Sequence, residues 1–172
     1  MAEATVNGLG QATTRALDVR FINPFVAGVS DVFTKVLGAW ARREAPRLSR
    51  DAVPDENLAA FIGLSGPVRG AVTLVLPVRT GLAVVQRMLG TPVTPDSPDL
   101  ADGLAEVVNM IAGGAKARLA AEATGPIDLG LPSVIRGHQF SVCYPSHTVW
   151  LEIPFDTQLG GCQLRITLES MP

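Results

Sequence analysis

The stretch from residue 97 to about residue 121 has the periodicity of one long amphipathic helix. Ser97, Pro98 and Asp99 are typical of a helix start, because serine caps free backbone amides and proline fits the first turn. Apolar residues then recur on one side of the helix: Leu100, Leu104, Val107, Val108 and Ile111. A helix with one apolar side must cover a core, so its opposite side is left for solvent or for a partner.

Segments with strand periodicity lie on both sides of this helix in the chain. Apolar residues between Leu58 and Pro77 largely alternate with other residues and bracket the turn Gly66–Gly70, which predicts a hairpin. Further strands are expected after the helix, at residues 133–144 with a break near Gly137, at 148–155 and at 162–168.

Helical spacing recurs in two segments that precede the long helix. Asn23 followed by Pro24 is a good start for the first. The second is predicted at residues 80–89, with Gly90 as its stop. Residues 42–55, rich in arginine and proline, are expected to form a loop. The fold class that we expect is mixed α/β, of the α+β type, with about three helices packed on a largely antiparallel sheet of five or six strands.

Length and composition indicate one domain. The chain has 172 residues, within the roughly 100 to 200 that usually form a single core. We expect residues 1–16 to be a flexible N-terminal tail and residues 17–172 to be a single domain. A net charge of -2 and a pI near 5.6 give no general attraction to nucleic acid or to an anionic membrane. Neither a secretory signal nor a membrane-spanning stretch is visible in the sequence, so we expect a cytoplasmic protein.

Several local motifs favour ordinary structural roles. The segment Gly63–Pro67 has proline where a nucleophile elbow needs its second glycine. Cys143 and Cys162 lack the spacing of a metal motif, so we expect buried, reduced thiols. The histidines, His138 and His147, belong to no metal-ligand pattern. We therefore predict no metal site in this chain.

Polar residues gather on the outward side of the predicted long helix. At 100° per residue, they fall within an arc of roughly 80°: Asp99, Asp102, Glu106, Asn109 and Gly113. Asparagine is a weak helix former, and Gly113 and Gly114 each cost about 1 kcal/mol relative to alanine. This spacing is compatible with a solvated surface and with a binding site, and it does not by itself name a reaction.

The same residues belong to a longer motif. It reads Asp102-x-x-x-Glu106-x-x-Asn109, continues as Asn109-Met-Ile-Ala-Gly-Gly-Ala-Lys116, and is followed by Leu-Pro132-Ser-Val. Together with segments 17–25 and 61–73, it resembles the CheX/CheC/FliY family of chemotaxis phosphatases. The similarity spans residues 17–168 and is closest to CheX, because only one copy of the motif is present.

The resemblance implies hydrolysis of the aspartyl phosphate on a response-regulator receiver domain, such as CheY. Asn109 would orient the attacking water and Glu106 would pair with the receiver's active-site lysine, so these two are the expected catalytic residues. Asp99, Asp102 and Gly113 would contact the receiver. No cofactor of its own is implied for this chain, since the Mg²⁺ is expected in the phosphorylated receiver.

The resemblance leaves two further questions open. Flagellar switch proteins related to this family use the scaffold for assembly, so the alternative function is a non-catalytic adaptor on the same scaffold, either receiver-binding or flagellar-switch-like. Related CheX proteins also suggest a homodimer. Trp150 would mark its surface if it is exposed, but it is equally compatible with a buried position under a second layer.

Overall fold

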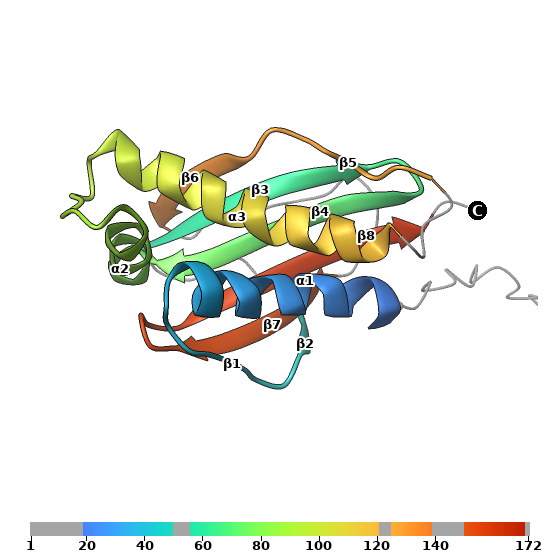
Figure 1. The fold of residues 1–172 in the computed structure, drawn as a ribbon, viewed down its shortest axis with the longest axis horizontal. Helices are drawn as coiled ribbons and strands as arrows, with labels where there is room; N and C mark the ends of the chain where they lie inside the picture. Colours follow the sequence, from blue (N-terminus) through green and yellow to red (C-terminus); the bar gives the residue numbers. More distant parts are fainter. Residues whose placement is uncertain (1–18, 50–55, 121–124, 139–149, 171–172) are drawn as a thin grey trace, which may run out of the picture.

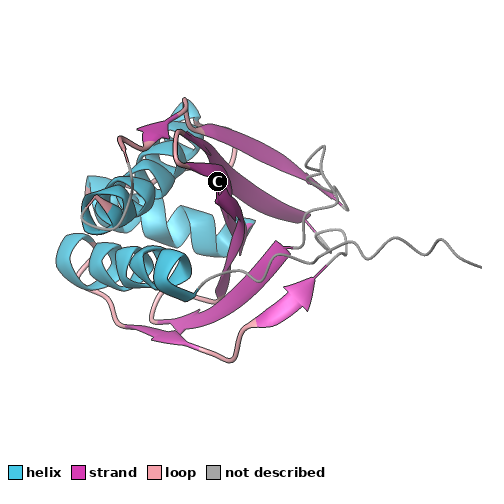
Figure 2. Ribbon diagram, turned by 90° about the vertical axis from the view of Figure 1, so that its right-hand side faces the viewer, coloured by secondary structure: helices cyan, strands magenta, loops and turns pink. Residues whose placement is uncertain are grey.

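In a computed structural model, the chain folds into a layer of helices on one face of a single sheet (Figure 1, Figure 2). The structure describes residues 19–49, 56–120, 125–138 and 150–170. The elements in chain order are α1 (Val19–Asp31), the π-helical turn η1 (Val32–Val36), β1 (Ala41–Arg43), β2 (Arg47–Ser49), β3 (Glu56–Ser65), β4 (Val68–Pro77), α2 (Val78–Leu89), α3 (Pro98–Leu119), β5 (Asp128–Leu129), β6 (Ser133–His138), β7 (Trp150–Thr157) and β8 (Cys162–Ser170).

All pairings between the described strands are antiparallel. The order across the sheet is β1-β7-β8-β4-β3-β5, with β2 also paired to β7 and β6 also paired to β3. The predicted hairpin is confirmed as β3 and β4, with Leu58 opposite Leu76 and Leu64 opposite Gly70. Because Ser65 ends a strand that turns into another strand, the Gly63–Pro67 segment is not a nucleophile elbow.

The expected fold class is confirmed, and the strand count is larger than expected. The described sheet has eight strands, where five or six were predicted. The prediction of a loop at residues 42–55 was wrong in part, because β1 and β2 pair with β7 there. Each has only three residues, too few to show an alternating pattern, so their pairing depends on the neighbouring strand. Residues 50–55 lie outside the described part of the chain.

The predicted start of the first helix was wrong. Asn23 and Pro24 were predicted to begin it, but the described helix already runs from Val19, and Pro24 lies inside it. Proline removes one backbone hydrogen bond there. Burial of the neighbouring Phe25 and Val29, both fully buried, favours the helix in spite of that loss. The predicted tail at residues 1–16 lies outside the described residues.

The other predicted helices are confirmed. α2 ends at Leu89, and Gly90 follows it in the left-handed conformation with φ 70°. α3 ends two residues before the predicted position. The strand expected at 133–144 is described as far as His138, and its continuation lies outside the described residues.

Close contacts between backbone and side chains fix how the helices pack. At Gly28 of α1, an added Cβ would lie 2.7 Å from the Ile111 carbonyl oxygen of α3. At Gly103 of α3, it would lie 2.6 Å from Cγ1 of Val85 in α2. Both glycines therefore let α3 approach its neighbours closely. α3 is held between the two other helices and the sheet, with one side left uncovered by them.

Candidate functional site

α3 carries the candidate site and begins with an N-terminal cap. The Ser97 hydroxyl oxygen accepts a hydrogen bond from the Asp99 backbone amide at 3.2 Å, and the hydroxyl donates to Asp99 Oδ2 at 3.0 Å. Pro98 stands in the first turn, as predicted. The exposed Asp99 carboxylate thus takes part in the cap, and its contact with a partner stays a prediction.

The inner side of α3 is buried in the main core. Every apolar residue predicted for this side is at most 3% exposed: Leu100, Leu104, Val107, Val108 and Ile111. Burying one such side chain contributes roughly 1.5 to 3 kcal/mol to folding, so the rotation of the helix about its own axis is strongly fixed. That rotation decides which residues face away from the core.

The outer side of α3 carries the other predicted site residues. Asp102 and Glu106 are exposed, while Asn109 and Gly113 are half-buried. They lie on successive turns of one helix face, so the structure brings them together as the spacing predicted. In the described part of the chain, no hydrogen bond or ion pair engages the Glu106 carboxylate or the Asn109 carboxamide. We name this row, from Asp102 through Glu106 and Asn109 to Gly113, the outer stripe.

The chemistry of the outer stripe suits recognition of a charged group on another molecule. A carboxamide both donates and accepts hydrogen bonds and is not basic, so Asn109 can orient a water molecule but cannot take its proton. The Glu106 carboxylate can pair with a cation. Gly113 adds no side chain, and a Cβ placed there would meet nothing within 4 Å.

Residues that could have built a different site are dispersed. Among the described residues, no group of three or more His, Cys, Asp and Glu side chains could hold a metal ion. Cys162 is a free, buried thiol, and burial raises its pKa to about 12, so it is a poor nucleophile. His138 is exposed on β6. Cys143 and His147 lie outside the described residues.

Trp150 is buried, with a relative exposure of 7%. It lies on β7 with Glu152, on the face opposite Ile153 and Phe155. The Arg165 guanidinium lies 5.6 Å from the centre of its ring, and Arg165 Nε lies 3.7 Å from Glu152 Oε2. Of the two positions left open for Trp150, the structure therefore has the buried one, and one strand alone could not decide this because Arg165 belongs to a neighbouring strand. Trp150 gives no support to a homodimer surface.

Comparison with known proteins identifies the family. The family model described as "Chemotaxis phosphatase CheX" matches residues 58–156, a span that contains the whole of α3. The chain belongs to the CheX family. Its membership confirms the resemblance that the motif around Glu106 and Asn109 indicated. Among curated proteins, none matches the chain.

Solved structures with the CheX fold cover most of this chain. A CheC-like superfamily protein from Shewanella sp. PV-4 has a TM-score of 0.80 at 24% identity, covering 90% of this chain and 100% of its own. The chemotaxis protein CheX from Desulfovibrio desulfuricans has a TM-score of 0.74 at 27% identity, covering 87% and 99%. CheX from Borrelia burgdorferi, solved in a complex with CheY, BeF3 and Mg²⁺, has a TM-score of 0.72 at 22% identity, covering 87% and 98%. The first and the last of these, at 24% and 22% identity, show the likeness of fold alone.

No described helix combines the length and apolar character that a bilayer crossing requires.

Proposed function

We propose that this CheX-family chain hydrolyses the aspartyl phosphate of a CheY-like receiver domain and so ends a two-component signal. One observation carries the proposal above all. Glu106 and Asn109 lie on the outer stripe of a rigidly packed helix, without a partner among the described residues. A pair of polar groups held in this way is suited to enter the active site of another protein.

Asn109 is proposed to orient the attacking water. Its carboxamide holds the water in line with the phosphorus, the water oxygen forms a new bond to phosphorus, and the bond from phosphorus to the aspartyl oxygen breaks. The electron pair of that bond stays on the aspartate carboxylate, and the water protons leave with inorganic phosphate and solvent. Asn109 supplies position and not basicity, because an amide is essentially non-basic.

Glu106 and the other stripe residues are proposed to set the register of docking. The Glu106 carboxylate pairs with the active-site lysine of the receiver, one helical turn from Asn109. Asp99 and Asp102 add polar contacts, and Gly113 allows the receiver surface to approach the helix backbone. The Mg²⁺ is proposed to belong to the receiver, and this chain contributes no metal ligand to the proposal; the complex solved for the Borrelia protein contains CheY and Mg²⁺ together with CheX.

The decisive experiment screens phosphorylated receivers from the same organism. Each receiver is phosphorylated and its phosphate loss is followed with and without catalytic amounts of the purified chain. We expect at least one receiver to lose phosphate faster than it does alone. The variant Arg42→Ala should accelerate phosphate loss as much as the unaltered chain does, since Arg42 is an exposed residue of β1 that pairs with Asp156 away from α3. If a receiver binds without faster phosphate loss, the chain is a non-catalytic adaptor and the proposal is wrong.

A further inference from the structure

The last third of α3 contains two adjacent glycines, which lower its intrinsic helix propensity. Gly113 and Gly114 follow Asn109 by one turn, and glycine has the lowest helix propensity after proline because its backbone loses the most freedom. In an α-helix, the Asn109 carbonyl oxygen accepts a hydrogen bond from the backbone amide of residue 113. Local unfolding at the glycine pair would therefore break the turn that begins at Asn109.

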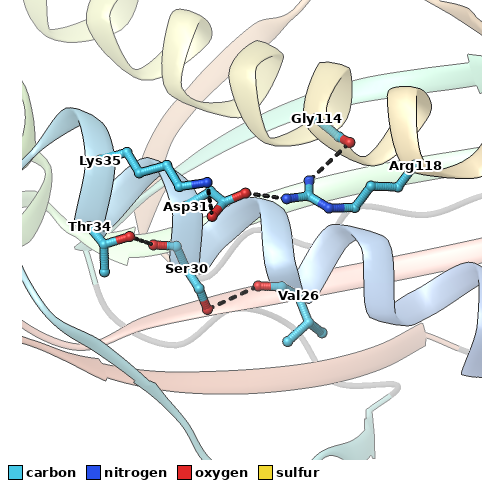
Figure 3. A network of polar contacts seen from close by, with 7 residues as sticks. All are labelled: Val26, Ser30, Asp31, Thr34, Lys35, Gly114 and Arg118. Atoms are coloured by element: carbon cyan, nitrogen blue, oxygen red, sulfur yellow. Dashed lines mark hydrogen bonds and ion pairs between the residues drawn. The ribbon is translucent and has the colours of Figure 1, made fainter.

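Arg118 braces this glycine pair from the side. Its Nη1 donates to the Gly114 carbonyl oxygen at 3.0 Å, and its Nη2 pairs with Asp31 Oδ2 of α1 (Figure 3). A Cβ added at Gly114 would lie 3.2 Å from Arg118 Nη1. The guanidinium therefore occupies the space that a side chain at residue 114 would fill.

Asp31 holds the other end of this brace. Its Oδ1 also pairs with Lys35 Nζ at 2.9 Å (Figure 3). Hydrogen bonds from Lys35 and then from Arg118 hold the pKa of the Asp31 carboxyl below its usual value, so Asp31 is ionised at neutral pH. Backbone contact supports the same alignment, since Gly28 packs on the Ile111 carbonyl nearby.

We propose that Asp31 and Arg118 form a clamp that keeps the Gly113–Gly114 segment helical, so that the outer stripe is already ordered when the receiver docks. The inference rests on the proposed function and makes both residues positioning residues for it. An exposed ion pair adds little to global stability, so the clamp acts mainly on the local segment that it touches.

The clamp has a distinct kinetic signature. Only the ordered form of the helix docks, so the apparent affinity for the receiver is proportional to the fraction of molecules in which the helix is ordered. Once docked, the helix is ordered by the receiver itself and the chemistry is unchanged. Loss of the clamp is therefore expected to raise KM and to leave kcat unaltered, whereas partial global unfolding would lower kcat by removing active protein.

Arg118→Met tests the clamp, because methionine keeps an unbranched side chain and removes the guanidinium. Amide hydrogen exchange in the segment from residue 113 to residue 118 should speed up by about five-fold, the upper end of the effect expected from losing one exposed ion pair. KM for the phosphorylated receiver should rise by a similar factor. Arg42→Met removes another exposed ion pair, with Asp156, and should change neither quantity.

The double variant Arg118→Met with Gly114→Ala is the sharper test. Alanine restores helix propensity at residue 114, and its methyl enters space that the guanidinium has left. Both hydrogen exchange and KM should return towards the values of the unaltered protein. If Arg118 instead contacted the receiver directly, alanine at residue 114 would not restore KM, and the proposal would be overturned.

Hydrogen exchange separates this inference from the proposed function. It is measured on the protein alone, so unchanged exchange in Arg118→Met would overturn the clamp whatever the enzyme does. Conversely, if no receiver loses phosphate faster with the unaltered chain than without it, the proposed function is wrong. Hydrogen exchange then still decides whether the clamp exists.

Discussion

Gly103 and Gly113 stand ten residues apart on α3, and their surroundings are opposite. A Cβ at Gly103 would lie 2.6 Å from Cγ1 and 2.9 Å from Cγ2 of the fully buried Val85. A Cβ at Gly113 would meet nothing within 4 Å. Packing among the described residues thus accounts for the first glycine and gives no reason for the second. A glycine that its own fold does not need is the kind expected where another molecule approaches.

The same contrast separates the two sides of α3 as a whole. The inner side consists of apolar residues whose burial fixes the helix, and the outer stripe consists of polar or small residues without partners among those described. Substitutions on the inner side should change stability, and substitutions in the outer stripe should change the action on a receiver. Variants on each side test whether this division is real.

The largest expected effect is on the outer stripe, at the two proposed catalytic residues. Asn109→Ala and Glu106→Ala should each slow receiver dephosphorylation greatly, and for Asn109 by on the order of 100- to 1,000-fold, the cost of removing one positioned amide in other enzymes. Thermal unfolding should be nearly unchanged, because both side chains face away from the core. Phosphate release measures the activity of each variant, and calorimetry on the same samples measures its thermal unfolding. Retention of full activity by Asn109→Ala would remove it from the mechanism.

On the inner side, Leu104→Ala should have the opposite profile. Leu104 is fully buried, and truncating such a leucine costs about 2 to 5 kcal/mol of unfolding free energy through lost burial and a cavity. Urea unfolding measures the loss. Activity per folded molecule should persist at a temperature where the variant is folded. A large loss of activity without a loss of stability would show that the two sides are not separate.

Gly103→Ala should destabilise the fold by a smaller amount. Its methyl would overlap Val85, and overpacking of this kind costs about 1 to 3 kcal/mol, from which up to about 1 kcal/mol of helix propensity is recovered. Adding Val85→Ala should make room for the methyl, so the two changes together should cost less than the sum of each alone. Strict additivity in urea unfolding would contradict the packing role of Gly103.

Much of this division was predictable from the sequence. The apolar period of α3 identified its inner side, and the cap at Ser97 and the stop at Gly90 were local signals that the structure confirmed. The position of the candidate site followed from the same period, and its proposed chemistry from the family resemblance of the motif around Glu106 and Asn109.

Features that depend on distant residues were not predictable. β1 and β2 become strands because β7 lies beside them, and Trp150 is buried beside Arg165, which belongs to another strand. The pairing of Asp31 with Arg118 joins positions 87 residues apart in the chain. No local pattern encodes such contacts, because each depends on how separate elements pack.

The smallest expected effect is the most telling one, because Gly113→Ala should move stability and docking in opposite directions. With no neighbour within 4 Å of the new methyl, the gain in helix propensity of up to about 1 kcal/mol is retained, and Tm should rise by about 2 to 4 °C for a domain of this size. The same methyl would hold off a receiver that packs against the helix backbone, so KM should rise by several-fold with little change in kcat. The double variant Gly114→Ala with Arg118→Met is the control, since its methyl enters the space that the guanidinium has left, away from the outer stripe, and should leave KM close to that of the unaltered protein. If Gly113→Ala stabilises the protein and leaves KM unaltered, Gly113 is not part of the docking surface, and the contrast with Gly103 says nothing about function.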